Sequence, residues 1–229
     1  MLNQLPTSSA WATHLRNTGM SSLRGSLLDP DSRGTDAEHD RFIEAFRDER
    51  GHRRRVDAPL LSRLLDRPVT AGAHDRAGDG SGGDLPEDLA AWLSLSDAGI
   101  AERFVDRVLA RSGAITEPSA DIGVEIWTET ELAALHAFDH LAQQHPGDPA
   151  ISARVREAVR WHTQTLQPDN ATNHPWAIHA FVRTALSDDP ASADARFHAE
   201  TLLNICCVSM GRPDRFSACI LLDAANALD

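Results

Sequence analysis

The sequence contains no Tyr and no Lys, few aromatic residues and no long apolar run. Aromatic residues make up 5% of the 229 residues and hydrophobic residues 41%, so we expect a core built mainly from Leu, Ala, Ile and Val. Such a core favours close helix packing over a strand-rich sandwich. No apolar run approaches the about 20 residues that span a bilayer. The first residues also lack a basic start followed by an apolar core, so we expect neither a membrane span nor a signal peptide.

Because Lys is absent, all 22 basic residues are Arg, and 34 acidic residues give a net charge of −12. The acidity is even, with 15 Arg against 21 acidic residues up to residue 128 and 7 against 13 after it. A nucleic-acid binder usually concentrates its basic residues on one surface. The only basic run is Arg53 to Arg55, which is flanked by acidic residues. The composition therefore gives no indication of nucleic-acid binding.

The three Cys, of which Cys206 and Cys207 are adjacent, do not suggest a disulfide framework. Without such a framework or a leader, a cytoplasmic location is expected. Adjacent Cys on a helix diverge by about 100°, so Cys206 and Cys207 are a poor pair for one metal ion, and buried Cys usually behaves as a small hydrophobe. No CxxC, P-loop, GxGxxG or GxSxG motif is present.

Glycine and proline divide the chain into unequal parts. Residues 1–70 carry short amphipathic patterns, such as Pro59 to Leu65, and predict short helices or a partly mobile segment. Residues 71–86 contain five Gly and few large apolar side chains, which predicts a linker or an exposed loop. Residues 87–229 are predicted to form a helical-hairpin domain.

Helix start and stop signals become regular after residue 128. Thr128 and Glu131 match a capping box, which predicts a helix start there, while residues 124–127 suggest a brief extended piece or a loop. Pro and Gly residues then separate several apolar helical patterns, the last of them after Gly211. These signals predict at least five consecutive antiparallel helices. We therefore expect an all-α fold of helical hairpins, either α/α-toroid-like or a partial α-solenoid.

One turn between two of these helices has a recognisable pattern. Pro168 cannot donate a backbone amide and disfavours helical geometry at Gln167, so a hard turn is predicted there. A helix followed by Gln-Pro-Asp-Asn and then Trp resembles the Q-x-D-G-x-W turn of α/α-toroid proteins such as squalene-hopene cyclases and prenyltransferase β-subunits. The matching positions are Gln167, Asp169 and Trp176, with Asn170 where Gly is usual and the Trp displaced by several residues.

This resemblance covers residues 129–228 and implies a helical-hairpin layout rather than a chemistry. The Asp-rich catalytic motif of the cyclases is not found in the sequence. Asp188 and Asp189 precede Pro190 and resemble a helix cap, not the DDxxD motif of terpene synthases. The resemblance therefore carries over no catalytic residue.

The histidines provide the clearest candidates for a functional site. His136 and His140 are four residues apart on one predicted helix, so their side chains share a face and could ligate one divalent metal ion. The sequence between them lacks the Glu that serves as general base in HExxH. A polar edge of an amphipathic helix is the alternative interpretation. A metal site would need a third ligand, for which the candidates are His162, His179 and His198.

A second set of candidates lies in strongly apolar surroundings. His179 and Asp223 sit within apolar helical patterns, so each must find a polar partner or face solvent. Together with Trp161, His162 and Trp176 they could line an apolar pocket, although a satisfied core histidine is the alternative for His179.

Three functional hypotheses follow from the sequence. The first is a non-catalytic helical scaffold that binds a protein or peptide partner. The second is a toroid-type enzyme or small-ligand-binding domain with an apolar central pocket, and the third is a His-rich metal-binding domain. The first and second differ in whether the polar candidates converge on one pocket, and the third requires three ligands within reach of one ion.

Overall fold

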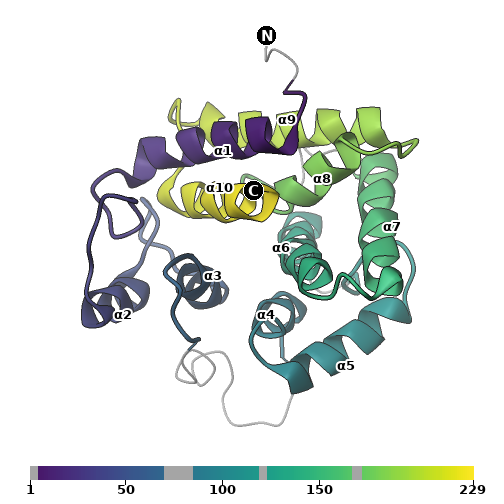
Figure 1. Ribbon diagram of the computed structural model, residues 1–229, viewed down its shortest axis with the longest axis horizontal. Coiled ribbons are helices and arrows are strands. Elements are labelled where there is room, and N and C mark those ends of the chain that lie inside the picture. Colours follow the sequence, from purple (N-terminus) through teal and green to yellow (C-terminus); the bar gives the residue numbers. More distant parts are fainter. Residues whose placement is uncertain (1–4, 70–84, 119–122, 167–171) are drawn as a thin grey trace.

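The computed structural model describes residues 5–69, 85–118, 123–166 and 172–229 of the chain, and Figure 1 shows the arrangement of its helices. All regular elements in these ranges are helices, which confirms the predicted all-α class. None of these helices is long and apolar enough to cross a membrane. Most of the segment predicted as a linker, and the turn at Gln167 to Asn170, lie outside the described residues. The helices are α1 (Ser8–Leu23), α2 (Asp36–Ala45), α3 (Asp57–Leu64), α4 (Glu87–Leu93), α5 (Ala98–Leu109), α6 (Val124–Gln144), α7 (Pro149–Thr165), α8 (Ile178–Ala185), α9 (Ser192–Val208) and α10 (Arg215–Leu228).

The first and last helices of the chain pack together along their lengths. Ser8 at the start of α1 donates a hydrogen bond to the carbonyl of Leu228 at the end of α10, so the two helices run antiparallel. Near the other end, a Cβ atom at Gly19 would lie only 2.9 Å from the carbonyl oxygen of Ala218. Glycine therefore permits the close approach of α1 and α10. The N-terminal segment belongs to the same hydrophobic core as the C-terminal helix.

Helix α6 lies in the middle of the molecule, in contact with α4, α7 and α8 (Figure 1). Its residues from Glu131 to Ala142 are all buried, including the polar ones. An amphipathic surface helix would expose one face to solvent. Because this part of α6 is covered on all sides, the polar side chains along it must find partners within the protein.

The start of α6 differs from the sequence prediction. The helix begins at Val124, so residues 124–127 are helical and not an extended piece. Thr128 lies inside the helix, where its hydroxyl donates to the carbonyl of Val124 and does not cap a helix start. Glu131 turns toward the segment before α6 and accepts hydrogen bonds from the backbone amides of Ile115 and Thr116, at 2.8 and 2.6 Å. Glu131 therefore pairs with the backbone of Ile115 and Thr116 and does not form the predicted capping box with Thr128.

Candidate functional site

Helix α6 places two histidines in the protein interior. His136 and His140 lie one turn apart, with only 0% and 2% of their surface exposed. Their rings are 5.3 Å apart between centroids. Because both side chains are buried, they do not form a polar edge of an amphipathic helix, which was the alternative interpretation of the sequence. Trp92 of α4 stacks on His136 at 5.4 Å and helps to exclude water from the pair.

Asp223 of α10 is the carboxylate that joins the two histidines. Its Oδ2 lies 3.0 Å from Nε2 of His136 and 2.5 Å from Nε2 of His140. Its Oδ1 accepts a hydrogen bond from Nε of Arg63 on α3, at 3.1 Å. Burial alone would raise the pKa of Asp223, but His140 and His136 lower it well below its ordinary value. Asp223 is therefore the negative centre of the group.

The protons on His136 and His140 are fixed by their outer partners. Arginine is always a donor. Nδ1 of His140 lies 3.1 Å from Nη2 of Arg63, so this ring nitrogen is the acceptor. His136 Nδ1 likewise accepts from the backbone amide of Ala177, at 3.0 Å. Both neutral rings then carry their proton on Nε2 and donate it to Asp223. Ala177 has a φ of +55°, which is unusual for a residue other than glycine and directs its amide toward His136.

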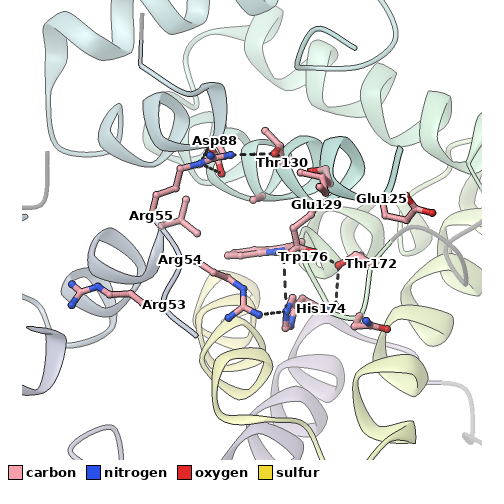
Figure 2. Close-up of a pocket in the computed structure, with 14 residues that line it drawn as sticks. Arg53, Arg54, Arg55, Asp88, Glu125, Glu129, Thr130, Thr172, His174 and Trp176 are labelled. Atoms are coloured by element: carbon pink, nitrogen blue, oxygen red, sulfur yellow. Dashed lines mark hydrogen bonds and ion pairs between the residues drawn. The ribbon is translucent and has the colours of Figure 1, made fainter. Parts of the chain in front are cut away.

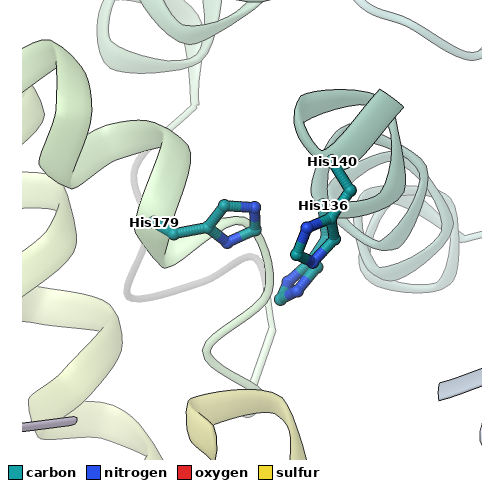
Figure 3. A group of neighbouring side chains, drawn as sticks. All are labelled: His136, His140 and His179. Atoms are coloured by element: carbon teal, nitrogen blue, oxygen red, sulfur yellow. The ribbon is translucent and has the colours of Figure 1, made fainter. Parts of the chain in front are cut away.

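His179 of α8 completes what we call the histidine cluster, which consists of His136, His140, His179 and Asp223. Its ring lies 4.2 Å from that of His136 and 4.9 Å from that of His140, between centroids (Figure 3). Each of the three histidines offers a nitrogen within 4.8 Å of the others, close enough to hold a metal ion. His179 is fully buried, and burial lowers its pKa to about 4.

The two ring nitrogens of His179 have different surroundings. Nε2 lies 3.0 Å from Oδ2 of Asp139, a residue of α6 that also pairs with Arg183. The alignment of this contact is not that of a hydrogen bond. Nδ1 has no hydrogen-bond partner among the described residues. A buried imidazole nitrogen without a partner is uncommon and indicates that something else can bind there.

Trp161 and His162, which the sequence grouped with these residues, lie against a different part of α6. Nε2 of His162 is 3.0 Å from Oε1 of Glu131, and the indole of Trp161 packs edge-on against Trp127. Burial alone would raise the pKa of Glu131, but His162 and the backbone amides of Ile115 and Thr116 lower it. This arrangement ties the segment before α6 to α7.

A cavity of about 760 Å³ opens beside Trp176, the last of the sequence-predicted pocket residues. Its lining comes from the segment before α3, from α4 and α6, and from the segment before α8: Arg53, Arg54, Arg55, Val56, Asp88, Glu125, Ile126, Glu129, Thr130, Ala133, Thr172, Asn173, His174 and Trp176. In Figure 2, Arg55 and Asp88 lie on one side of Trp176, and Arg54 and His174 lie on the other. Pockets of 300 to 1,000 Å³ commonly bind small ligands.

The polar groups of the cavity are held in place by neighbours. Nε of Arg55 donates to both oxygens of Asp88, at 2.7 and 2.8 Å. The indole nitrogen of Trp176 donates to Oε1 of Glu129 at 2.6 Å, and the hydroxyl of Thr172 donates to the other oxygen of Glu129. The side chains of Arg55, Asp88 and Glu129 are therefore already held in one conformation before a ligand binds, which reduces the entropic cost of binding.

His174 at the edge of the cavity is not available as a base. Nη2 of Arg54 donates to Nε2 of His174 at 2.9 Å, so the proton of the His174 ring lies on Nδ1. This Nδ1 is 2.8 Å from the hydroxyl of Ser217. Burial lowers the pKa of His174. Because His174 donates to Ser217 instead of accepting its proton, this pair is not arranged for nucleophilic catalysis.

The structure thus brings His136, His140, His179 and Asp223 together and places Trp176 next to them. The indole of Trp176 is 5.4 Å from the ring of His136, between centroids. Sequence reasoning missed Arg63, although it is the one charged residue in an otherwise apolar pattern from Pro59 to Leu65. No family model, curated protein or solved structure matches this chain.

Proposed function

We propose that this protein is a helical scaffold that binds an extended peptide segment in the cavity beside Trp176. The observation that carries this proposal is the pairing of opposite charges around one opening. Among the described residues, three Arg and three carboxylates line the cavity, so this part of the lining is balanced, whereas the chain as a whole has a net charge of −12. The cavity therefore repels anionic groups less than the rest of the surface does.

The lining suits a polypeptide because it offers both donors and acceptors. Every peptide residue presents an N–H and a C=O that must be satisfied on binding. Glu129 can accept from N–H groups, while the half-exposed guanidinium of Arg55 and the side chain of Asn173 can donate to carbonyls. A purely apolar groove would leave these backbone groups unpaired.

The mouth of the cavity also carries an apolar side chain that faces solvent. Ile126 on α6 lines the cavity and is 62% exposed. It extends the contact surface beyond the enclosed volume, which suits a chain that continues past the cavity more than a fully enclosed metabolite. Ile126 serves as the apolar anchor in this proposal.

A peptide-display library selected on the full-length protein tests the proposal. We expect enriched peptides whose affinity, measured with synthetic copies, falls about tenfold or more in Ile126→Asp and in Glu129→Gln. Phe197→Asp is the matched control, because Phe197 on α9 is 66% exposed and lies outside the cavity lining. Its affinity should equal that of the wild type.

Three outcomes would overturn the proposal. One is a selection that enriches no peptide on a protein shown to be folded by circular dichroism. Another is a set of peptides that bind Ile126→Asp and Glu129→Gln as tightly as the wild type. Binding of free carboxylates or amines without any peptide would assign the cavity to a metabolite and would also contradict the proposal.

A further inference from the structure

The histidine cluster has a feature that its hydrogen bonds do not explain. Nδ1 of His179 is buried and has no hydrogen-bond partner in the described part of the chain, although the rings of His136 and His140 lie within 5 Å between centroids. A buried polar atom without a hydrogen bond costs free energy. Atoms of this kind in native proteins often mark the position of a missing water, ion or ligand.

The donor atoms of the cluster are those that transition metals prefer. Imidazole nitrogens suit zinc, copper, iron and nickel, and a carboxylate completes many such sites. An ion held by bonds of about 2.0 to 2.1 Å requires ligand nitrogens within about 4 Å of one another. One nitrogen of His140 and one nitrogen of His179 already lie within 4.8 Å of each other, so less than about 1 Å of movement would bring them into range.

Arg63 contacts both His140 and Asp223 of the cluster. Its guanidinium holds the proton of His140 on Nε2, and this nitrogen then donates to Asp223 and cannot bind a metal. The same guanidinium supplies the positive charge beside Asp223. Unlike the buried residues of the cluster, the side chain of Arg63 is 36% exposed, so it can turn outward without unfolding the core.

We propose that the histidine cluster is a transition-metal site that Arg63 closes. When Arg63 turns toward solvent, the proton of His140 moves to Nδ1, and Nε2 joins Nδ1 of His179 and the carboxylate of Asp223 as ligands. His136 keeps its proton on Nε2, because the backbone amide of Ala177 cannot turn away, and it holds Asp223 in place. Asp139, whose Oδ2 lies 3.0 Å from Nε2 of His179, is placed to become the outer carboxylate that orients this ligating histidine once the ring turns into hydrogen-bond alignment.

Titration of the metal-free, full-length protein with Co²⁺ tests this proposal through visible absorption, which appears when nitrogen ligands surround the ion. Arg63→Met should bind one Co²⁺ per chain about tenfold or more tightly than the wild type, a gain of about 1.4 kcal/mol per factor of ten. Arg67→Met is the matched control, since Arg67 pairs with Asp36 and Asp40 outside the cluster. It should behave as the wild type.

Adding His179→Ala to Arg63→Met should abolish the absorption. Three results would overturn the proposal: equal affinity in the wild type and Arg63→Met, absorption that survives the loss of His179, or no absorption in a folded Arg63→Met protein. If Arg63→Met does not fold, Arg63→Gln keeps a polar side chain and answers the same question. None of these readouts depends on peptide binding, so this proposal and the proposed function can fail separately.

Discussion

Two arginine–histidine pairs in this protein are built alike, but the histidine and the carboxylate are more deeply buried in one pair than in the other. At the cavity, Arg54 donates to a ring nitrogen of His174 and pairs with Asp48 at 3.2 Å. In the interior, Arg63 donates to a ring nitrogen of His140 and pairs with Asp223 at 3.1 Å. In both pairs, the arginine decides which nitrogen of the histidine carries the proton.

The carboxylates of the two pairs are satisfied in different ways. Asp48 accepts hydrogen bonds from the backbone amides of Arg50 and His52 as well as from Arg54. Among the residues that the structure describes, Asp223 accepts from side chains alone, namely Arg63, His136 and His140. A carboxylate that is held by backbone amides, such as Asp48, stabilises the loop in which it lies. A carboxylate that is held by side chains, such as Asp223, depends on side chains that can change rotamer or be substituted.

The largest expected effect is on stability, and it should separate the two carboxylates. Asp223→Ala leaves two buried Nε2–H groups without an acceptor, and we expect a loss of about 3 to 5 kcal/mol in the free energy of unfolding. Asp48→Ala should lose about 1 to 2 kcal/mol, because water can reach the groups left behind. Urea unfolding of both variants measures the difference, and equal losses would remove the distinction.

The buried histidines should make the fold sensitive to mild acid. The pKa of His179 is lowered to about 4 from an ordinary value of 6.5, so between these values the unfolded chain binds a proton that the folded protein does not. The free energy of unfolding therefore decreases as the pH falls from 6.5 to 4, by up to about 1.4 kcal/mol per pH unit for this residue. The pKa of His136 is lowered by burial as well, which acts in the same direction.

Replacing one histidine at a time would assign this effect. His179→Leu should flatten the pH dependence of urea unfolding between pH 6.5 and 4 by about one proton. His145→Leu, at an exposed position after α6, should leave the slope as it is in the wild type. A slope unchanged in His179→Leu would mean that this ring is already protonated in the folded protein.

Trp176 connects the cavity to the cluster, and its replacement should have an intermediate effect. Trp176→Phe keeps an aromatic ring against His136 but removes the N–H that donates to Glu129. A hydrogen bond to a charged group contributes about 1.5 to 3 kcal/mol, so we expect a loss in this range. Thermal and urea unfolding would check it, and an unchanged free energy of unfolding would show that Glu129 finds another donor.

The smallest effect on stability is expected at the mouth of the cavity. Ile126 is mostly exposed, so Ile126→Asp should change the free energy of unfolding by less than about 0.5 kcal/mol. The cavity variant would then differ from the cluster variants by weakening peptide binding without weakening the fold. A large loss of stability in Ile126→Asp would instead give this side chain a structural role.

The all-α class and most helices of the second half were predictable from the sequence, because their caps are local. Pro149 and Asp214, for instance, lie at the starts of α7 and α10, where proline at the first helical positions and a capping aspartate are common. The start of α6 was not predictable in this way. Glu131 fits a capping box in the sequence, but its partners in the structure are Ile115 and Thr116 before the helix and His162 on α7, and such tertiary pairs leave no periodic pattern.

The candidate site was predictable in part for the same reason. The spacing of His136 and His140 places them on one helix face, and the apolar surroundings of His179 and Asp223 require each to have a polar partner. The choice of partners depends on how distant helices pack. Arg63 is 160 positions from Asp223 in the chain, and only the folded core brings the two side chains together.

The most direct test of this account is the protonation of the two arginine-bound histidines, measured by ¹⁵N NMR of the imidazole rings at neutral pH. We expect opposite neutral tautomers in the metal-free protein, because Arg63 faces Nδ1 of His140 whereas Arg54 faces Nε2 of His174. His140 should carry its proton on Nε2, and His174 should carry its proton on Nδ1. The same tautomer in both rings, or a positively charged ring at either position, would contradict it.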